Sequence, residues 1–254
     1  MLQGYPLRQY TWKDWLLMIL SSSIVLQIVV ALGASLLVNI DTSGLSAEAA
    51  NAVVAQQLFR LSINSSVYGT LISLPLVLLV MHWRKIPLLN RRQLSKKESF
   101  IIRGLNKEDW KFLVKYIPVS YVLYIAGSMI VATLFDAGQP ENQIAVESLF
   151  NYVPLWVMFI MIVIVAPIAE ELLFRGIFLF PGKAHKTTWV RVIISAVLFG
   201  LVHNPTDVHS FYTYVGMGFI FAYASKRTQS VEAAIVYHFL NNLLGFLVIL
   251  SEFS

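Results

Sequence analysis

The chain has 254 residues, of which 57% are hydrophobic and 13% are charged. This charged fraction is about half the ~25% typical of soluble domains, so neither a disordered chain nor an ordinary soluble domain fits the composition. Cysteine is absent, which excludes disulfides, thiolate metal sites and a cysteine nucleophile. The net charge is +5, and its meaning depends on where the basic residues lie.

Long apolar runs recur along the chain, and a helix needs about 20 apolar residues to cross a bilayer. They predict an all-α polytopic membrane helix bundle of about seven to eight transmembrane helices, formed by a single integral membrane domain of residues 1–254. The first run is longer than a signal-peptide core, so we expect it to remain as a helix. Pro167 lies inside the fourth run, and we expect it to interrupt that helix. The seven runs are residues 15–38, 61–83, 112–135, 152–180, 190–202, 211–225 and 231–250.

The basic residues follow the alternation of the loops. Every Lys and Arg except Arg60 and Arg175 falls on one side of the predicted membrane, so the positive-inside rule places the N-terminus in the cytoplasm. Residues 84–111 mix basic and apolar side chains and are expected to form a cytoplasmic or interfacial segment, with Asn106 capping the third span. Contact with anionic lipid explains this segment, and no nucleic acid partner is needed.

Several polar residues lie where lipid-facing side chains are expected, and such residues are costly enough to indicate function. The 1.5 Å rise per residue places them at similar depths near the middle of a ~30 Å core, so we expect them to meet in one buried cavity. Glu171 and Arg175 are four residues apart and can form an ion pair, while Glu170 projects about 100° away. The set comprises Glu170, Glu171, Arg175, His203, His238 and Asn242.

These side chains restrict the chemistry. A carboxylate and a histidine can activate a water molecule, and the other histidine and the asparagine can donate hydrogen bonds to an oxyanion. Glu170, His203 and His238 could instead hold a divalent metal such as zinc, with an open position for water. Ser195 is disfavoured as a nucleophile because it is eight residues from His203. A metal site formed by His203 with Asp207 and His209 is a weaker alternative.

The Glu-Glu-x-x-x-Arg, Phe-x-x-x-His and His-x-x-x-Asn motifs, in this order, resemble those of the CAAX protease and bacteriocin-processing (CPBP, or Abi) family of intramembrane proteases. The resemblance covers residues 152–250, the expected catalytic core of spans four to seven, and the part before it has only generic membrane character. It implies that Glu170 is the general base and His203 the second water-activating residue. It assigns His238 and Asn242 to the oxyanion, and Glu171 and Arg175 to support. Metal dependence stays open, and we favour a metal-independent mechanism.

The sequence therefore predicts a bacterial-type intramembrane endopeptidase, CAAX-prenyl-endopeptidase-like, in the plasma membrane. Its partners would be the lipid bilayer and a membrane-associated peptide or protein substrate. The alternative is a non-proteolytic membrane protein of the same family, either one that gives immunity to a bacteriocin or a scaffold for a membrane signalling partner. A transporter is less favoured because no two related halves with interrupted helices are detected.

Overall fold

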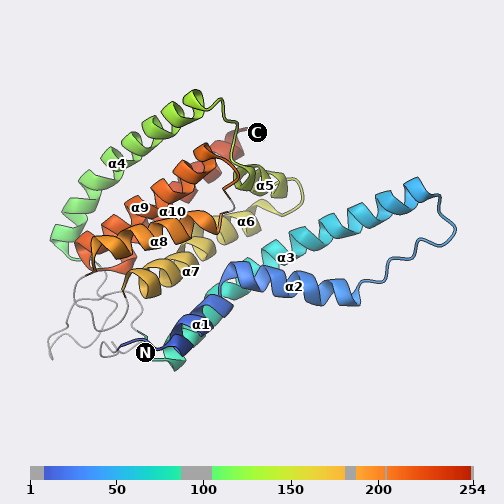
Figure 1. Ribbon diagram of the computed structural model, residues 1–254, viewed down its shortest axis with the longest axis horizontal. Helices are drawn as coiled ribbons and strands as arrows, with labels where there is room; N and C mark the ends of the chain where they lie inside the picture. Colours follow the sequence, from blue (N-terminus) through green and yellow to red (C-terminus); the bar gives the residue numbers. More distant parts are fainter. Residues whose placement is uncertain (1–8, 87–104, 181–186, 204, 253–254) are drawn as a thin grey trace.

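The computed structural model describes residues 9–86, 105–180, 187–203 and 205–252. Across these ranges it contains helices and no β-strand, which confirms the predicted all-α bundle (Figure 1). The elements are α1 (Trp12–Leu20), α2 (Ser23–Leu37), α3 (Ala47–Trp83), α4 (Lys107–Leu134), α5 (Glu141–Leu149), α6 (Leu155–Met158), the π-helical η1 (Phe159–Val165), α7 (Ala166–Leu173), the π-helical η2 (Phe174–Leu179), α8 (Trp189–Leu201), α9 (Val208–Thr228) and α10 (Val231–Glu252).

The seven apolar runs all coincide with helices. Within the described residues, α3, α4, the continuous helix Leu155–Leu179 and α10 are each long and apolar enough to cross a membrane. The pair α1 and α2 passes the same test only as one bent unit. Helix α8 is apolar but short, as its 13-residue run predicts. Large apolar side chains stay exposed along these helices, for example Leu36, Leu123 and Val248, as expected where lipid is the solvent.

The first predicted span is not one straight helix. Helices α1 and α2 meet at 56°, and Ser22 between them has extended backbone angles of φ −68° and ψ 152°. The Ser21 hydroxyl donates to the carbonyl oxygen of Met18, a local hydrogen bond of the kind that competes with helix continuation. The prediction of an unbroken helix over residues 15–38 is therefore wrong, because consecutive serines end the first segment.

Two further elements differ from the sequence prediction. Helix α3 begins at Ala47 rather than near residue 61, and its 37 residues span about 55 Å, well beyond a ~30 Å apolar core. Hydropathy alone missed the first part of this helix because it carries polar residues. The short helix α5 was also not predicted, since residues 141–149 lack a long apolar run.

Pro167 does not interrupt its helix, so that expectation is wrong. The helix runs from Leu155 to Leu179, and π-helical turns precede and follow the α-helical segment α7. Pro167 stands in the first turn of α7, where the hydrogen-bonding register changes from π to α. A missing backbone N–H is tolerated at such a junction, so the chain keeps its direction through the proline.

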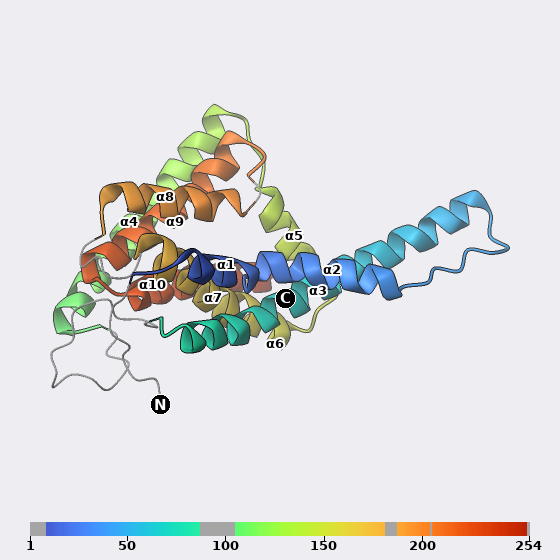
Figure 2. The same ribbon diagram turned by 60° about the horizontal axis from the view of Figure 1, so that its bottom comes forward.

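The helix Leu155–Leu179 is the central element of the bundle. Its segments pack against α3, α8 and α10, while α2 and α3 form an antiparallel hairpin on one side and α4 packs against α9 on the other. Figure 2 shows the α2–α3 hairpin extending away from the other helices. One apolar core, including Leu172, Phe199 and Phe221, surrounds the end of the central helix near η2. A second core, including Met161 and Phe246, surrounds its beginning.

The basic segment of residues 84–111 is described only at its ends, and residues 87–104 lie outside the described residues. At one end, Arg84 Nε lies 2.6 Å from Asp14 Oδ1, which ties the end of α3 to α1. At the other end, the Asn106 side chain accepts a hydrogen bond from the Asp109 backbone at 2.9 Å. Asn106 is therefore the N-cap of α4, as its sequence context predicted.

The close packing of α8 against α9 gives a test of the fold. A Cβ atom on Gly218 would lie 2.8 Å from the Ala196 carbonyl oxygen and 3.0 Å from the Ala196 Cα, so backbone would have to move. We expect Gly218→Ala to lower the free energy of unfolding by about 1–3 kcal/mol. Gly33→Ala is the matched control, because nothing lies within 4 Å of the added Cβ. Thermal unfolding in detergent measures both, and equal stability of the two variants would contradict the packing.

Candidate active site

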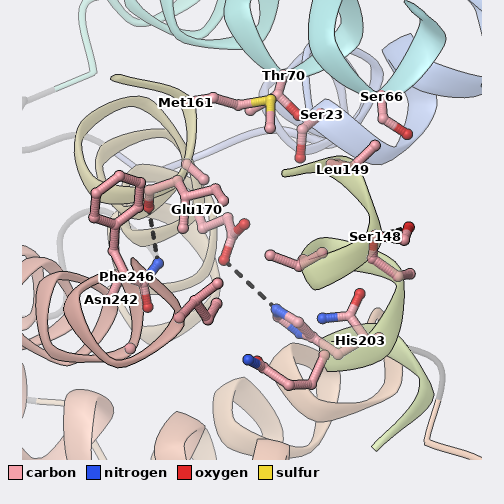
Figure 3. Close-up of a pocket in the computed structure, with 18 of the residues that line it drawn as sticks. Ser23, Ser66, Thr70, Ser148, Leu149, Met161, Glu170, His203, Asn242 and Phe246 are labelled. Atoms are coloured by element: carbon pink, nitrogen blue, oxygen red, sulfur yellow. Dashed lines mark hydrogen bonds and ion pairs between the residues drawn. The ribbon is translucent and has the colours of Figure 1, made fainter. Parts of the chain in front are cut away.

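The polar residues predicted to converge do meet at one cavity. It has a volume of about 470 Å³, and its lining includes Glu170 from α7, His203 just after α8, and His238 and Asn242 from α10. Figure 3 shows Glu170, His203 and Asn242 around this space, with Ser23 and Thr70 across it. Side chains from spans four, five and seven thus share one site, whereas their catalytic roles stay predictions.

Glu170 and His203 face each other. His203 Nε2 lies 3.9 Å from Glu170 Oε2, and the two side chains are 17% and 19% exposed, so both reach the cavity (Figure 3). Glu170 Oε2 has no hydrogen-bond partner within the described residues. His203 Nδ1 lies 2.7 Å from the carbonyl oxygen of Phe199. Because a carbonyl only accepts, Nδ1 carries the proton, and a neutral His203 presents the lone pair of Nε2 toward Glu170.

A buried ionic network lies directly beside this pair. Arg175 donates from Nη1 to Glu171 Oε1 at 2.9 Å, and both side chains are fully buried. His238 Nδ1 lies 2.9 Å from the same carboxylate oxygen. Arg175 also donates from Nη2 to the carbonyl oxygen of Gly218 on α9 at 2.6 Å. The network therefore joins the central helix to α9 and α10 by groups that cannot be separated cheaply in a low-dielectric interior.

Aromatic rings surround this network. The guanidinium of Arg175 lies 4.8 Å from the centroid of Phe199 and 5.6 Å from that of Phe221. The ring of His238 stacks on Phe221 with centroids 4.7 Å apart. The ring of His203 stacks on Tyr214 at 4.7 Å with an interplanar angle of 13°. These contacts fix the orientations of both imidazoles. The contribution of Tyr214 and Phe221 to the site was not predicted from the sequence, because aromatic residues are common in every span.

The amide of Asn242 is oriented from both ends. Its Nδ2 donates to the carbonyl oxygen of Ile162 at 2.9 Å, as drawn in Figure 3, and its Oδ1 accepts from Asn241 at 3.1 Å. The carbonyl belongs to η1, in the π-helical part of the central helix. One amide hydrogen of Asn242 is left for a further acceptor, and this geometry suits hydrogen bonding to a group in the cavity.

The residues present do not fit a metal centre. Among the described residues, no three His, Cys, Asp or Glu side chains lie close enough together to hold a metal ion.

Three other residues raised by the sequence have structural roles. His209 contacts Gly138 O through Nδ1 and Ser128 Oγ through Nε2, so it joins α9 to α4 and the following loop. Asp207 caps α9, and hydrogen bonds from Ser210, the backbone N–H first, hold the pKa of its carboxyl below the usual value. Ser195 donates to the carbonyl oxygen of Phe174 at 3.1 Å. The contacts of these three residues therefore support the fold, and they do not form a second catalytic site.

The wall of the cavity opposite Glu170 comes from elements to which the sequence assigned no function. Helices α2, α3 and α5 contribute neutral polar side chains, which share the ability to hydrogen bond without charge. Gln27 on α2 donates to Thr70 on α3 at 3.1 Å, and Asn142 on α5 donates to the Tyr214 hydroxyl at 3.3 Å. The available signal in the sequence was the spacing of four residues between the polar side chains on α3, which places them on one face of the helix. The lining hydroxyls and amides of this wall are Ser23, Gln27, Ser62, Ser66, Thr70, Asn142, Gln143 and Ser148.

Comparison with known proteins agrees with the geometry. Residues 152–244 match the family described as type II CAAX prenyl endopeptidase Rce1-like. This range contains Glu170, His203, His238 and Asn242. The resemblance to the CAAX protease and bacteriocin-processing family is confirmed. Helices α1 to α5 lie outside the matched range, and no solved structure matches the chain.

Three relatives are similar to parts of the chain. The UPF0177 protein YbdI of Lactococcus lactis is 29% identical over 58% of this chain and 78% of its own length. The putative membrane peptidase YdiL of Bacillus subtilis is 36% identical over 46% of this chain and 47% of its own. The membrane-embedded CAAX protease MroQ of Staphylococcus aureus is 25% identical over 56% of this chain and 60% of its own. The chain thus spans about half the length of YdiL and less than two thirds of MroQ.

The buried network predicts a non-additive effect on stability. Arg175→Met would leave the fully buried Glu171 carboxylate without its cation and should lower the free energy of unfolding by about 3–5 kcal/mol. The double variant Glu171→Gln with Arg175→Met removes the stranded charge and should be more stable than Arg175→Met alone. Thermal unfolding of the wild type, both single variants and the double variant gives the coupling. Additive losses would show that the two charges do not support each other.

Proposed function

We propose that this protein is an intramembrane endopeptidase that hydrolyses a peptide bond by a water molecule held between Glu170 and His203. The observation that carries the proposal is the buried, unpartnered Glu170 Oε2 facing the Nε2 lone pair of His203 at 3.9 Å. Two acceptors at this separation can both receive hydrogen bonds from one water, whose oxygen then points its lone pairs away from them. This arrangement prepares the water for attack on a carbonyl carbon.

The proton transfers follow from the same geometry. Glu170 accepts a proton as the water oxygen bonds to the carbonyl carbon, and the C=O electron pair moves onto its oxygen. The C–N bond then breaks as the tetrahedral intermediate collapses, and the proton held by Glu170 passes to the leaving nitrogen. The products are a carboxylic acid and an amine, so atoms and charge balance without a further reactant.

We assign the stabilisation of the oxyanion to Asn242 and His238. Asn242 retains an amide hydrogen after donating to Ile162. His238 donates from Nδ1 to Glu171, so its Nε2 becomes a donor only when the ring carries a second proton. The amide hydrogen of Asn242 and a proton on His238 Nε2 would be the two donors to the oxyanion.

The cavity favours an extended peptide as substrate. A peptide must leave helical geometry before its bond can be attacked, and its freed backbone N–H and C=O groups then need partners away from lipid. The hydroxyl and amide groups of α2, α3 and α5 supply such partners across from Glu170. We propose a membrane-associated peptide or protein as the substrate class. Because MroQ is named a CAAX protease, a prenylated CAAX peptide is the first probe to use.

Substitution of the water-activating pair tests this mechanism. In purified protein reconstituted into lipid vesicles, Glu170→Gln and His203→Ala should each lower kcat for a quenched-fluorescent peptide by at least 100-fold, since the first removes the base that takes the proton and the second removes an acceptor for the water. A farnesylated CAAX peptide and its unprenylated counterpart serve as probes. Glu48→Gln, on the outer part of α3, is the control and should cleave at the wild-type rate. Wild-type activity in either site variant would overturn the mechanism.

The orientation in the membrane is also a proposal. The first residues of α1, α4 and α8 and the last residues of α3 and α9 lie toward one end of the bundle (Figure 2), and basic residues cluster at these positions in the sequence. This arrangement supports a multi-pass protein in a bacterial plasma membrane with the N-terminus and this basic end in the cytoplasm.

Cysteine labelling tests the orientation because the natural chain has no cysteine. Ser43→Cys lies in the loop between α2 and α3, and Lys13→Cys lies at the beginning of α1. In intact cells, a membrane-impermeant maleimide should label Ser43→Cys and spare Lys13→Cys, whereas both should react after the membrane is permeabilised. The reverse pattern in intact cells would show the opposite orientation.

A further inference from the structure

A second, smaller cavity meets the large one at the catalytic pair. Its volume is about 130 Å³, and it shares Glu170 and His203 with the large cavity. It also shares Ser23, Gln27 and Asn142, but it extends in another direction, toward the break between α1 and α2. The residues that line the small cavity alone are Ser22, Ile24, Ala169, Leu173, Phe174 and Val202.

We propose that the small cavity is a water-holding site that supplies the hydrolytic water, separate from the large cavity that takes the peptide. This inference rests on the proposed peptidase function and assigns the ligand of a part of the site that the mechanism above leaves unused. Three features support it: the polar groups of the small cavity, the helix break beside it and its position relative to the peptide.

The small cavity has the volume and the partners that ordered water requires. A volume of about 130 Å³ holds about four water molecules at the ~30 Å³ that each occupies in the liquid. Ser22 and Ser23 are each 8% exposed, and both line this cavity together with Glu170. Glu170 Oε2 is buried without a hydrogen-bond partner among the described residues. Buried polar atoms are normally satisfied, and a buried water makes two to four polar contacts. Ser22, Ser23, Glu170 and His203 together can provide them.

The broken helix gives an independent reason for water at this place. Ser22 lies about 15 Å along the helix from Trp12, and Glu170 lies about 14 Å from the end of its helix at Leu179, so both are deep in the bundle. At such depth, non-helical backbone is tolerated only where it is buried in protein or lines a water-filled cavity. The 56° break borders the small cavity through Ser22 and Ser23, so water in this cavity would hydrate their hydroxyls.

The two cavities would also let a peptide and the hydrolytic water reach the same residues at the same time. A peptide in the large cavity would cover Glu170 and His203 from that side and displace the water there. Because the same two residues line the small cavity, water held beside Ser22 and Ser23 reaches them from a different direction. Figure 3 places Ser23 and Ser66 at different positions across from Glu170, and only Ser23 lines both cavities.

Kinetics of variants that fill the small cavity test this separation. Ser22→Val and Val202→Phe remove a hydroxyl or occupy the volume, and each should lower kcat for the quenched-fluorescent peptide at least tenfold while KM stays within twofold. Ser66→Val, in the large cavity only, should raise KM instead. Ser35→Val is the matched control, because this serine is on α2, is exposed and lines neither cavity. An unchanged kcat in both filling variants would overturn the proposal.

Cysteine reactivity tests the water content without depending on cleavage. In the cysteine-free chain, Ser22→Cys should react with a small charged methanethiosulfonate reagent at least tenfold faster than Ile28→Cys, which is 54% exposed on the lipid-facing side of α2. The thiolate forms only in contact with water, so a dry small cavity would make both equally slow and overturn the proposal.

A bound peptide separates the two cavities in the same assay. In the Glu170→Gln background, saturating farnesylated peptide should protect Ser66→Cys and leave Ser22→Cys reactive. Protection of both would show that the peptide fills the small cavity, which would overturn the proposal while leaving a peptidase function intact. Failure of the proposed function has a different signature, because Ser22→Cys would still react although no peptide is cleaved.

Discussion

The site depends on one buried carboxylate, Glu171. Its Oε1 binds Arg175 and His238 at the same time, and Arg175 continues to the carbonyl of Gly218. These contacts lock the central helix against α9 and α10, because separating the charges in a low-dielectric interior costs several kcal/mol. Once Glu171 points inward to this network, Glu170, one residue earlier and about 100° around the helix, must point to a different surface. That surface is the cavity, where His203 faces it at 3.9 Å.

The π-helical segments allow this arrangement of side chains within the continuous helix Leu155–Leu179. Each π turn holds an extra residue, which changes the rotational phase of the side chains that follow, and such turns occur frequently at functional sites. Segment η1 lies before the acidic pair and offers the Ile162 carbonyl to Asn242. Segment η2 lies after it and carries Arg175. Pro167 stands between them, so the residue that suggested a broken helix marks a change of register within a continuous one.

The part of the site that could be predicted from sequence consists of the ionisable residues and Asn242. Glu170, Arg175 and His203 are conspicuous because ionisable groups within apolar runs are costly, and helical spacing was sufficient to pair Glu171 with Arg175. The polar wall on α2, α3 and α5 was missed because serine, threonine and glutamine are tolerated at helix contacts in any membrane protein. The break at Ser22 has neither proline nor glycine at the junction, and its stability depends on tertiary contacts that one segment of sequence does not contain.

The predicted polar residues of the site and the polar wall that was missed come from different parts of the chain. The family match covers residues 152–244, which contribute the charged groups and both imidazoles. The wall across the cavity comes from α2, α3 and α5, outside the matched range. A peptide between these two sides would meet a fixed set of reacting groups on one side and neutral hydrogen-bonding groups on the other. The buried ion pair of Glu171 and Arg175 therefore holds the reacting groups in place, because such a pair has few alternative geometries. Neutral hydroxyls and amides adapt to a peptide backbone of varying sequence, so the N-terminal helices are the part of the fold in which substrate choice can change without disturbing the Glu171 network.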